Sequence, residues 1–277
     1  MTPYAHPEVL VDTQWLADRL DDPNLRIVEV DNSPDPYQNR HIPGAVFWGI
    51  FPDLVQPSFR MKLDPEAMET LLSRSGISNR TTVIAYGSYP GTGAWIFWLL
   101  KFFGHDNVYV LNGGHKKWLA EGRPLASELS TFPATNYHAK SLNSSMRVLY
   151  PDVRNSLERS DCLLLDVRTA KEFKGEQYGM EPPKPGERAG HIPGATHIEH
   201  IQALNEDGTF KSADELHALF GDRGVTPDKE IVPYCAIGAR SASICFVLQY
   251  LLGYPNVRNY DGSWNEWSRI PDAPVEH

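Results

Sequence analysis

Short apolar runs of strand length alternate along the chain with longer runs of helical length. The short runs are rich in Val, Ile and Leu, which favours buried strands. Two long apolar runs, Ala94–Phe103 and Ser241–Leu252, are each followed by a glycine, a residue that commonly ends helices. Strands that alternate with helices predict a parallel sheet with helices on both faces. We expect strands at residues 27–30, 83–85, 108–111, 163–167, 231–234 and 256–260, and further helices at about 13–20, at 214–220 and from 150 onward.

A second pattern is that the chain repeats itself. The segment HIPGA occurs at His41–Ala45 and again at His191–Ala195. Farther along, one constant offset aligns residues of the first half with identical residues of the second half. The aligned pairs are Phe97 with Phe246, Leu99 with Leu248, Gly104 with Gly253, Asn107 with Asn256, Val108 with Val257, Gly113 with Gly262 and Trp118 with Trp267. An ordered series of this kind indicates a tandem duplication.

The duplication suggests where the domains begin and end. We predict an α/β protein of two similar domains, at residues 1–125 and 149–277, each a parallel sheet flanked by helices. Residues 126–148 lie between them. This stretch is rich in Ser, Thr and Ala and lacks periodicity, which is typical of a linker.

Composition and charge exclude several classes of function. The chain is 41% hydrophobic and 22% charged, as in ordinary soluble globular proteins, and its net charge of −9 disfavours nucleic acid as a partner. No stretch is long and apolar enough to span a membrane, and the N-terminus does not resemble a secretory signal. The cysteines, Cys162, Cys235 and Cys245, are odd in number and form no CxxC pair. They indicate neither a disulfide framework nor a zinc site, so we expect a reducing cytoplasm and no bound metal.

Cys235 is the candidate nucleophile. It follows the expected strand 231–234 and opens a small-residue loop, which leads through Arg240 into the long apolar helix. Backbone N–H groups and the positive end of the helix dipole converge at such a helix start, so the cysteine should have a lowered pKa and be largely thiolate near neutral pH. The alternative is a buried core cysteine, but a core cysteine does not usually open a glycine-containing loop that ends in arginine.

The two copies differ where chemistry is expected. The constant offset matches Cys235 with Tyr86 and Arg240 with Gly91. The first copy therefore has neither the nucleophile nor the cation. We expect one active copy, with the other supporting it or forming one wall of a cleft between the domains, where ligands commonly bind.

Four motifs in order make the chain resemble the rhodanese family, and more closely its tandem-domain thiosulfate sulfurtransferases. The motifs are Asp166–Arg168 with Glu172 and Phe173, then Gly190–Ala195, Cys235–Arg240 and Tyr260–Trp267. The resemblance covers nearly the whole chain. It implies two tandem rhodanese-like domains, the first of them catalytically silent.

The resemblance also implies a ping-pong sulfur transfer. The Cys235 thiolate would attack the outer sulfur of a donor such as thiosulfate, and sulfite would leave. The resulting persulfide would pass its sulfur to an acceptor such as cyanide, a thiol or a dithiol, on a small molecule or a protein, with no metal or organic cofactor. The loop residues Ala236, Ile237, Gly238 and Ala239 are the expected substrate-binding residues, because their amides can surround a persulfide anion.

Three other functions stay open. A 3-mercaptopyruvate sulfurtransferase would use the same cysteine, and Ala236 and Ile237 match neither donor subtype of the family. A persulfide carrier or regulatory module is the non-enzymatic alternative. Phosphatases of the Cys–Arg type place five residues between the two, whereas this chain has four between Cys235 and Arg240, which disfavours that activity.

Two arginines are candidates for binding the donor. Arg240 stands at the start of the helix and would bind an anionic donor or, alternatively, pair with a structural carboxylate. Arg188 lies in a charged, proline-containing insertion, residues 174–188. Related mercaptopyruvate enzymes carry a substrate-binding arginine in this stretch, and the alternative interpretation of Arg188 is a solvated loop charge.

Four further residues are expected to support the site. Asp166 and Arg168, at the end of a central strand, should form a buried ion pair or hydrogen-bond network that Glu172 could join. His191 has a counterpart, His41, in the copy that lacks a nucleophile. We therefore expect both histidines to make a structural hydrogen bond in a turn.

Overall fold

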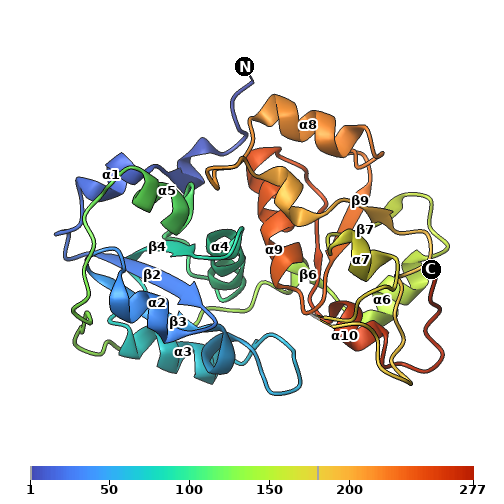
Figure 1. Ribbon diagram of the computed structural model, residues 1–277, viewed down its shortest axis with the longest axis horizontal. Helices are drawn as coiled ribbons and strands as arrows, with labels where there is room; N and C mark the ends of the chain where they lie inside the picture. The colour runs from blue at the N-terminus through green and yellow to red at the C-terminus, as the bar shows by residue number, and fades with distance from the viewer. Residues whose placement is uncertain (1, 180) are drawn as a thin grey trace.

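The chain forms two α/β lobes side by side in a computed structural model that describes residues 2–179 and 181–277 (Figure 1). The first lobe is built on a five-stranded parallel sheet in the order β1-β5-β4-β2-β3. Its strands are β1 (Leu10–Val11), β2 (Leu25–Asp31), β3 (Ala45–Gly49), β4 (Thr82–Gly87) and β5 (Val108–Leu111). Its helices are α1 (Thr13–Ala17), α2 (Pro34–Asn39), α3 (Pro65–Arg74), α4 (Thr92–Phe102) and α5 (Gly114–Ala120), with short turns η1 (Pro7–Val9) and η2 (Ile50–Leu54).

The second lobe repeats this plan. Three parallel strands pair in the order β8-β7-β9, and two more, β10 and β6, pair in parallel beside them. The strands are β6 (Arg147–Val148), β7 (Cys162–Asp166), β8 (Thr196–His197), β9 (Glu230–Tyr234) and β10 (Asn259–Tyr260). The helices are α6 (Tyr150–Ser156), α7 (Ala170–Phe173), α8 (Ala213–Gly221), α9 (Ala239–Phe246) and α10 (Ser263–Trp267), with shorter turns η3 (Ser144–Met146), η4 (His200–Ala203) and η5 (Val247–Leu251).

The two sheets share one strand order. A parallel bridge between Ile231 and Val257 places β10 beside β9, as β5 lies beside β4 in the first lobe. The predicted α/β fold of two parallel sheets flanked by helices is confirmed. Side-chain contacts repeat as well, since the indole N–H groups of Trp118 and Trp267 each donate to a proline carbonyl at 2.8 Å.

The sequence pattern missed the shortest strands. β1, β6 and β8 contain two residues each, too few for a period to be visible. One of them, β6 (Arg147–Val148), lies within the segment predicted to be the linker, yet it pairs with β10 in the second sheet. Before β6 and the short turn η3, the predicted linker has no named helix or strand and packs on the first lobe. There the Thr135 N–H donates to the Ser73 carbonyl, and the ring of Tyr137 is buried.

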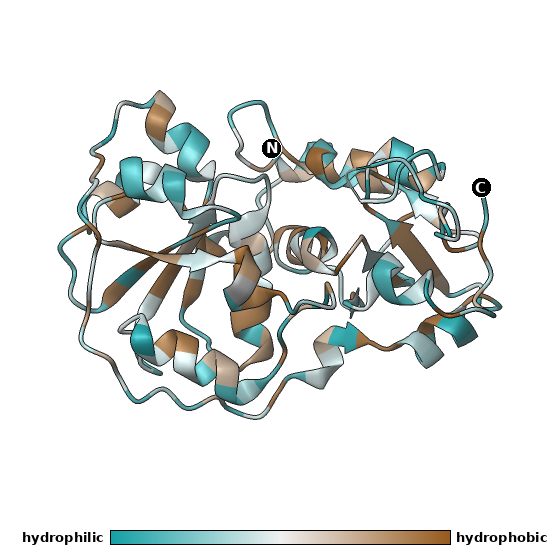
Figure 2. Cartoon of the chain, turned by 60° about the horizontal axis from the view of Figure 1, so that its bottom comes forward, coloured by the Kyte–Doolittle hydropathy of each residue, from teal (hydrophilic) through white to brown (hydrophobic). Residues whose placement is uncertain are grey.

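The two lobes meet along helices α4 and α9, which lie at the centre of the molecule (Figure 1). The ring of Phe97 on α4 packs edge-on against Phe246 on α9, with centroids 4.9 Å apart, and against Tyr250 at 4.8 Å. Colouring by hydropathy shows that apolar residues dominate the sheets and the helices between them, while the outer loops are mostly polar (Figure 2). One buried cluster of apolar side chains includes residues of both lobes, so the core is continuous across their boundary.

Among the described residues, 2–179 and 181–277, there is no helix with the length and apolar character needed to cross a membrane.

The packing of α4 on α9 predicts the effect of a cavity at this interface. We expect Phe97→Ala to lower the free energy of unfolding by roughly 3–5 kcal/mol, because the ring is fully buried between two aromatic partners. Denaturant unfolding followed by fluorescence would measure this. Phe59→Ala, at a ring that is 53% exposed, is the control and should cost less than about 1 kcal/mol. Equal losses in the two variants would contradict the assignment of Phe97 to the core.

Candidate active site

Cys235 lies directly after β9, at the carboxyl edge of the second sheet. Three residues separate it from α9, whose first residue is Ala239. The carboxyl ends of parallel strands are the usual place for ligands in sheets of this kind. The predicted arrangement of strand, tight loop and helix around Cys235 is therefore present.

Gly238 gives the loop its sharp turn. Its φ is +92°, and a Cβ at this position would lie 2.8 Å from the backbone of Asp261. Only glycine fits both restrictions. The turn brings the Gly238 N–H to 3.1 Å from Sγ of Cys235, to which it donates. The Gly238 carbonyl is held in turn by the side-chain amide of Asn259 at 3.0 Å.

Ser263 fixes the other side of the cysteine. Its hydroxyl accepts a hydrogen bond from the Cys235 N–H at 3.0 Å and donates to the Tyr260 carbonyl at 2.7 Å. Ser263 is fully buried and has a φ of +53°, a conformation that non-glycine residues rarely adopt. Such strain persists where surrounding contacts enforce it, and here those contacts position Cys235.

The pKa of the Cys235 thiol is lowered. Burial acts to raise the pKa, but the positive charge of Arg240 and hydrogen bonds from Ser241 and the Ile237 amide together outweigh it. By contrast, burial raises the pKa of Cys162, and it raises that of Cys245 well above the ordinary value. Thiolate character is thus concentrated at Cys235, the candidate nucleophile, and not at the other two cysteines.

Arg240 pairs with Glu172. Its two terminal nitrogens contact the two carboxylate oxygens at 2.8 and 2.9 Å, a bidentate ion pair. Burial raises the pKa of Glu172, but the bonds and charge of Arg240 outweigh this and lower it. Of the two interpretations of Arg240, the structure displays pairing with a carboxylate. Glu172 also caps α7 through Thr169, so it fixes the guanidinium from a defined position.

Asp166 and Arg168 form the predicted buried ion pair. The guanidinium contacts the carboxylate at 2.6–3.0 Å and donates to the Gly190 carbonyl at 2.7 Å, and both side chains are at most 1% exposed. Glu172, which could have joined this pair, bonds to Arg240. The Glu172–Arg240 pair ties α7 to the start of α9, and the Asp166–Arg168 pair ties the end of β7 to the Gly190 carbonyl.

A cavity of about 490 Å³ opens above the cysteine. Although Cys235 is only 1% exposed, it lines this cavity together with Ala236, Ile237, Ala239 and Arg240. The opposite wall comes from the first lobe and is largely aromatic. It contains Ile50, Phe51, Phe59, Tyr89, Pro90 and Trp95. Of the two expected roles of the first copy, the structure displays the wall of a cleft between the lobes.

Arg188 is not brought to this cavity. Its guanidinium donates to the carbonyls of Ile270 and Ala273 in the C-terminal segment, and the side chain is not part of the cavity wall. The structure therefore does not support the prediction that Arg188 binds substrate. Nor is it a solvated loop charge, because its hydrogen bonds hold the chain end in place.

The two HIPGA histidines have matching environments. His191 Nδ1 contacts the Phe173 carbonyl at 2.9 Å, and the imidazole stacks on the Phe173 ring. His41 Nδ1 contacts the Tyr37 carbonyl at 2.6 Å and stacks on Tyr37. The same contacts occur in both lobes, which agrees with the structural role expected of these residues.

The first lobe has a glycine, Gly87, at the position of the nucleophile. The hydroxyl of Tyr86 accepts the Ile42 N–H at 3.3 Å, just as the hydroxyl of Tyr234 accepts the Ile192 N–H at 3.1 Å. Tyr86 is therefore the counterpart of Tyr234. The match of Tyr86 with Cys235 was wrong, because the offset between the copies is 148 residues at Tyr86 and Tyr234 and is 149 from Phe97 and Phe246 onward.

The glycine in front of each long helix shows that a second match also needs correction. Gly91 and Gly238 precede α4 and α9 with φ of +80° and +92°, so Gly91 corresponds to Gly238 and not to Arg240. A side chain at Gly87 would collide with the Val30 carbonyl at 2.5 Å and with Thr92. The first copy still lacks a cysteine at this position. The space that a side chain would need there is occupied by the Val30 carbonyl and Thr92.

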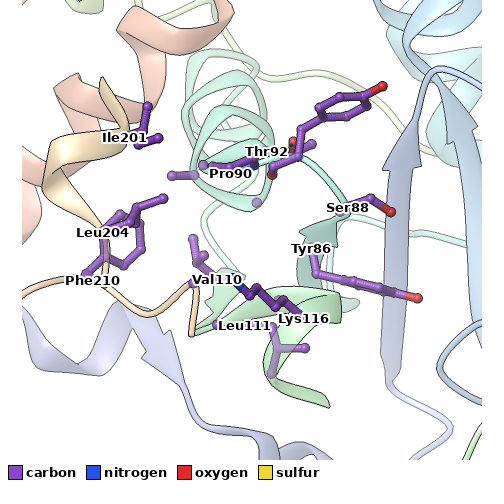
Figure 3. Close-up of a pocket in the computed structure, with 18 of the residues that line it drawn as sticks. Tyr86, Ser88, Pro90, Thr92, Val110, Leu111, Lys116, Ile201, Leu204 and Phe210 are labelled. Atoms are coloured by element: carbon purple, nitrogen blue, oxygen red, sulfur yellow. Dashed lines mark hydrogen bonds between the residues drawn. The ribbon is translucent and has the colours of Figure 1, made fainter. Parts of the chain in front are cut away.

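A second cavity, of about 310 Å³, marks the corresponding edge of the first sheet (Figure 3). In the figure, Ser88 and Tyr86 lie on one side of it and Ile201, Leu204 and Phe210 on the other. Segment 201–210 of the second lobe thus lines this edge of the first lobe, as segment 50–59 of the first lobe lines the Cys235 cavity. Each lobe thus lines the sheet edge of the other, and among the described residues at these two edges only the second lobe places a cysteine.

Sequence reasoning missed one titratable residue at the site. His200, the first residue of η4, lines the cavity with Cys235. The aromatic residues from the first lobe were missed as well. Their positions follow from the packing of two domains, which no local pattern reveals, but His200 could have been noticed because it follows the HIPGA segment closely.

Comparison with known families gives a match to both halves of the chain. The profile of the rhodanese-like domain matches residues 12–121 and 150–270. The sulfur carrier protein TtuD of Thermus thermophilus is 45% identical over 279 aligned positions, which cover 98% of each chain. A protein of Haloferax volcanii with a provisional thiosulfate sulfurtransferase name is 40% identical, over 97% of this chain and 96% of its own.

Solved structures that resemble this chain over its full length include sulfur-containing complexes of EanB. A variant of EanB, with a cysteine persulfide and ergothioneine in a tetrahedral intermediate state, superimposes with a TM-score of 0.88 at 25% identity. The match covers all of this chain and 72% of EanB. The anaerobic ergothioneine biosynthesis enzyme of Chlorobium limicola, in complex with trimethyl histidine, gives a TM-score of 0.85 at 25% identity, with 72% of that chain covered.

The electrostatics of the site predict how Cys235 titrates. We expect Arg240→Gln to raise the pKa of Cys235 by about one to three pH units, because the cation that favours the thiolate is lost while the burial remains. The pH dependence of alkylation by iodoacetamide, with the modified peptide identified by mass spectrometry, would measure the shift. Arg154→Gln, at an exposed position of α6, is the control. An unchanged alkylation midpoint in Arg240→Gln would contradict the role of Arg240.

Proposed function

The chain belongs to the rhodanese-like domain family of sulfurtransferases, and on that premise we propose that it takes the outer sulfur of thiosulfate onto Cys235 and passes it to a thiophilic acceptor. One observation carries this proposal. A cysteine with a lowered pKa lies at the floor of a cavity large enough for a small donor.

The first half-reaction follows from the geometry. The Cys235 thiolate attacks the outer sulfur of thiosulfate, a new S–S bond forms, and the original S–S bond breaks with its electron pair on the departing sulfite. The amide of Gly238 already contacts Sγ, and the amides at the start of α9 have no partners within the helix. These donors can stabilise the negative charge of the persulfide.

The second half-reaction returns the enzyme to its starting state. A nucleophilic acceptor attacks the outer sulfur of the persulfide, and Cys235 leaves as a thiolate. A lowered pKa makes Cys235 a good leaving group for this step. The acceptors that fit are cyanide, a small thiol or dithiol, or a thiol on a protein.

A persulfide carrier is the second candidate, and the name of one relative favours it. The Thermus protein is called a sulfur carrier protein. A carrier would form the same persulfide on Cys235 but deliver it only to a protein partner. Persulfide formation without turnover on any small acceptor would favour this alternative.

The proposal predicts a specific loss in one cysteine variant. Cys235→Ser should reduce thiocyanate formation from thiosulfate and cyanide to the background rate, because serine cannot form a persulfide. Cys162→Ser is the matched control and should retain activity, since burial raises the pKa of that thiol. After thiosulfate treatment, the wild-type protein and Cys162→Ser should each gain the mass of one sulfur atom, and Cys235→Ser should not. Intact-mass spectrometry would measure the gain. Normal thiocyanate formation by Cys235→Ser would refute the assignment.

The Arg240–Glu172 pair predicts how strongly the donor binds. Glu172→Gln removes the negative charge that neutralises Arg240 next to the cavity, so the dianion thiosulfate should bind more tightly. We expect its KM to fall roughly tenfold, which corresponds to about 1.4 kcal/mol. Initial rates with thiosulfate measure the change, and rates with the monoanion 3-mercaptopyruvate, whose KM should fall less, provide the comparison. A higher KM for thiosulfate would show that Glu172 acts mainly by holding Arg240 in place.

A further inference from the structure

Residues 55–61 of the first lobe and residues 204–210 of the second form two tight hairpins that copy each other. Each hairpin is closed by an antiparallel bridge between its first and last residues. The Phe59 N–H donates to the carbonyl three residues before it at 2.9 Å, and the Gly208 N–H makes the same bond at 3.0 Å. Phe59 and Gly208 therefore occupy the same position in the turn.

This position of the turn requires a left-handed backbone. The φ angle is +86° at Gly208 and +59° at Phe59. Glycine adopts such an angle freely, whereas a residue with a Cβ is strained there. Among the residues that the structure describes, Phe59 and Ser263 are the two non-glycine residues with a positive φ, and Ser263 holds the backbone of Cys235. Strain of this kind gathers at functional sites, so the phenylalanine calls for a functional reason.

The ring of Phe59 lies in the wall of the Cys235 cavity. It is 53% exposed and meets the ring of Phe51 edge-on, with centroids 5.6 Å apart. The same ring lines an adjoining cavity of about 450 Å³, together with Ala236 and Ile237 of the cysteine loop. An apolar ring that stays half exposed gains free energy when a molecule in the cavity covers it.

Helix α10 fixes Phe59 relative to the nucleophile. The backbone N–H of Asn265 donates at 3.0 Å to the carbonyl of Ala236, the residue after Cys235. The side-chain amide of Asn265 donates to the carbonyls of Ser58 and Phe59 at 3.1 and 3.0 Å. One residue thus holds both the cysteine loop and the strained turn, so the ring keeps a set place beside the reacting sulfur.

We propose that Phe59 determines the acceptor of this site, and that its ring packs on the carbon skeleton of an organic thiol. This inference rests on the proposed function. The acceptor attacks as a thiolate, and its sulfur forms a bond to the outer sulfur of the Cys235 persulfide. The bond between that sulfur and Sγ breaks, and its electron pair stays on Cys235. The product leaves as the anion R–S–S⁻, and no oxidant or reductant is consumed.

The rest of the cavity wall supports an organic acceptor. Tyr89 and Ile201 are also exposed apolar residues of this wall. Arg240 is the only lysine or arginine among the described residues that line it, and Glu172 neutralises that charge. Such a surface favours a thiol on a carbon skeleton over a small hydrated anion such as cyanide.

The test compares an acceptor that has a carbon skeleton to cover the ring with one that has none. The protein is loaded with thiosulfate, desalted and mixed with benzyl mercaptan or with cyanide, each below saturation. Loss of one sulfur atom from the intact mass gives the discharge rate. We expect Phe59→Gly to discharge to benzyl mercaptan roughly tenfold more slowly than wild type, because the aromatic contact is lost. Its loading by thiosulfate and its discharge to cyanide should be unchanged.

Two variants serve as controls for the rate measurements. Phe59→Tyr keeps the ring and should discharge to both acceptors at the wild-type rates. Leu129→Ala removes an exposed apolar side chain that is not part of this cavity wall, and it should also behave as wild type.

Denaturant unfolding tests the backbone strain separately from the rates. Phe59→Gly should be at least as stable as Phe59→Ala, because alanine keeps a Cβ at the positive φ and glycine does not. Phe59→Gly that unfolds at a lower denaturant concentration than Phe59→Ala would contradict the strain on which the inference depends.

The rate outcomes are distinct. Phe59→Gly that discharges to benzyl mercaptan at the wild-type rate, or that is slowed equally with cyanide, would overturn the inference. So would a tenfold loss in Phe59→Tyr, which retains the ring. Wild-type protein that gains no sulfur from thiosulfate would instead overturn the proposed function.

Discussion

A sulfur anion that is almost entirely removed from water must be stabilised by the protein itself, and the second lobe is organised around that requirement. Cys235 is 1% exposed, and burial alone would keep its thiol protonated. The loop must therefore direct a backbone N–H at Sγ, which it can do only because Gly238 adopts a positive φ. Ser263, held in a strained conformation, keeps the cysteine backbone in register with this donor.

The cation that completes the site is itself restrained. Arg240 lowers the pKa of Cys235 while it is bound at both ends of its guanidinium by Glu172. An unpaired arginine would bring a full positive charge to the cavity and would bind many anions. Pairing keeps the charge close to the sulfur and leaves the rest of the cavity nearly neutral. The site can thus hold a thiolate without offering a general anion-binding pocket.

The sequence allowed the fold and the nucleophile to be predicted because both depend on local patterns. Apolar runs of two lengths indicated the parallel sheets, and the strand, loop and helix around Cys235 indicated a reactive thiol. Partners that lie far apart in the chain could not be assigned in this way. Glu172 was a possible partner of Arg168 and bonds to Arg240, since all three meet at one sheet edge and only the geometry decides which charges pair.

The same limit explains the other errors. Arg188 was placed at the site by its position in an insertion, but the insertion leads it to the carbonyls of Ile270 and Ala273. Tyr86 was matched with Cys235 because the offset of 149 residues, which holds from Phe97 and Phe246 onward, was extended to a preceding stretch where the offset is 148. The hydrogen bonds of the two tyrosines give the right match. The hydroxyls of Tyr86 and Tyr234 each accept the backbone N–H of the isoleucine in the HIPGA segment, so Gly87 is the counterpart of Cys235.

The reciprocal arrangement of the lobes gives a physical role to the first lobe, which has a glycine where the second lobe has Cys235. Segment 50–59 of the first lobe forms a wall of the Cys235 cavity, and segment 201–210 of the second lobe lines the corresponding cavity of the first lobe. The apolar core also runs without interruption from one lobe to the other through α4 and α9. A lone second lobe would expose the apolar face of α9 and open its cysteine to water, where burial and a single cation would no longer set its pKa. The duplicated domain thus contributes to the chemistry through the environment it provides, although its own nucleophile position is occupied by a glycine.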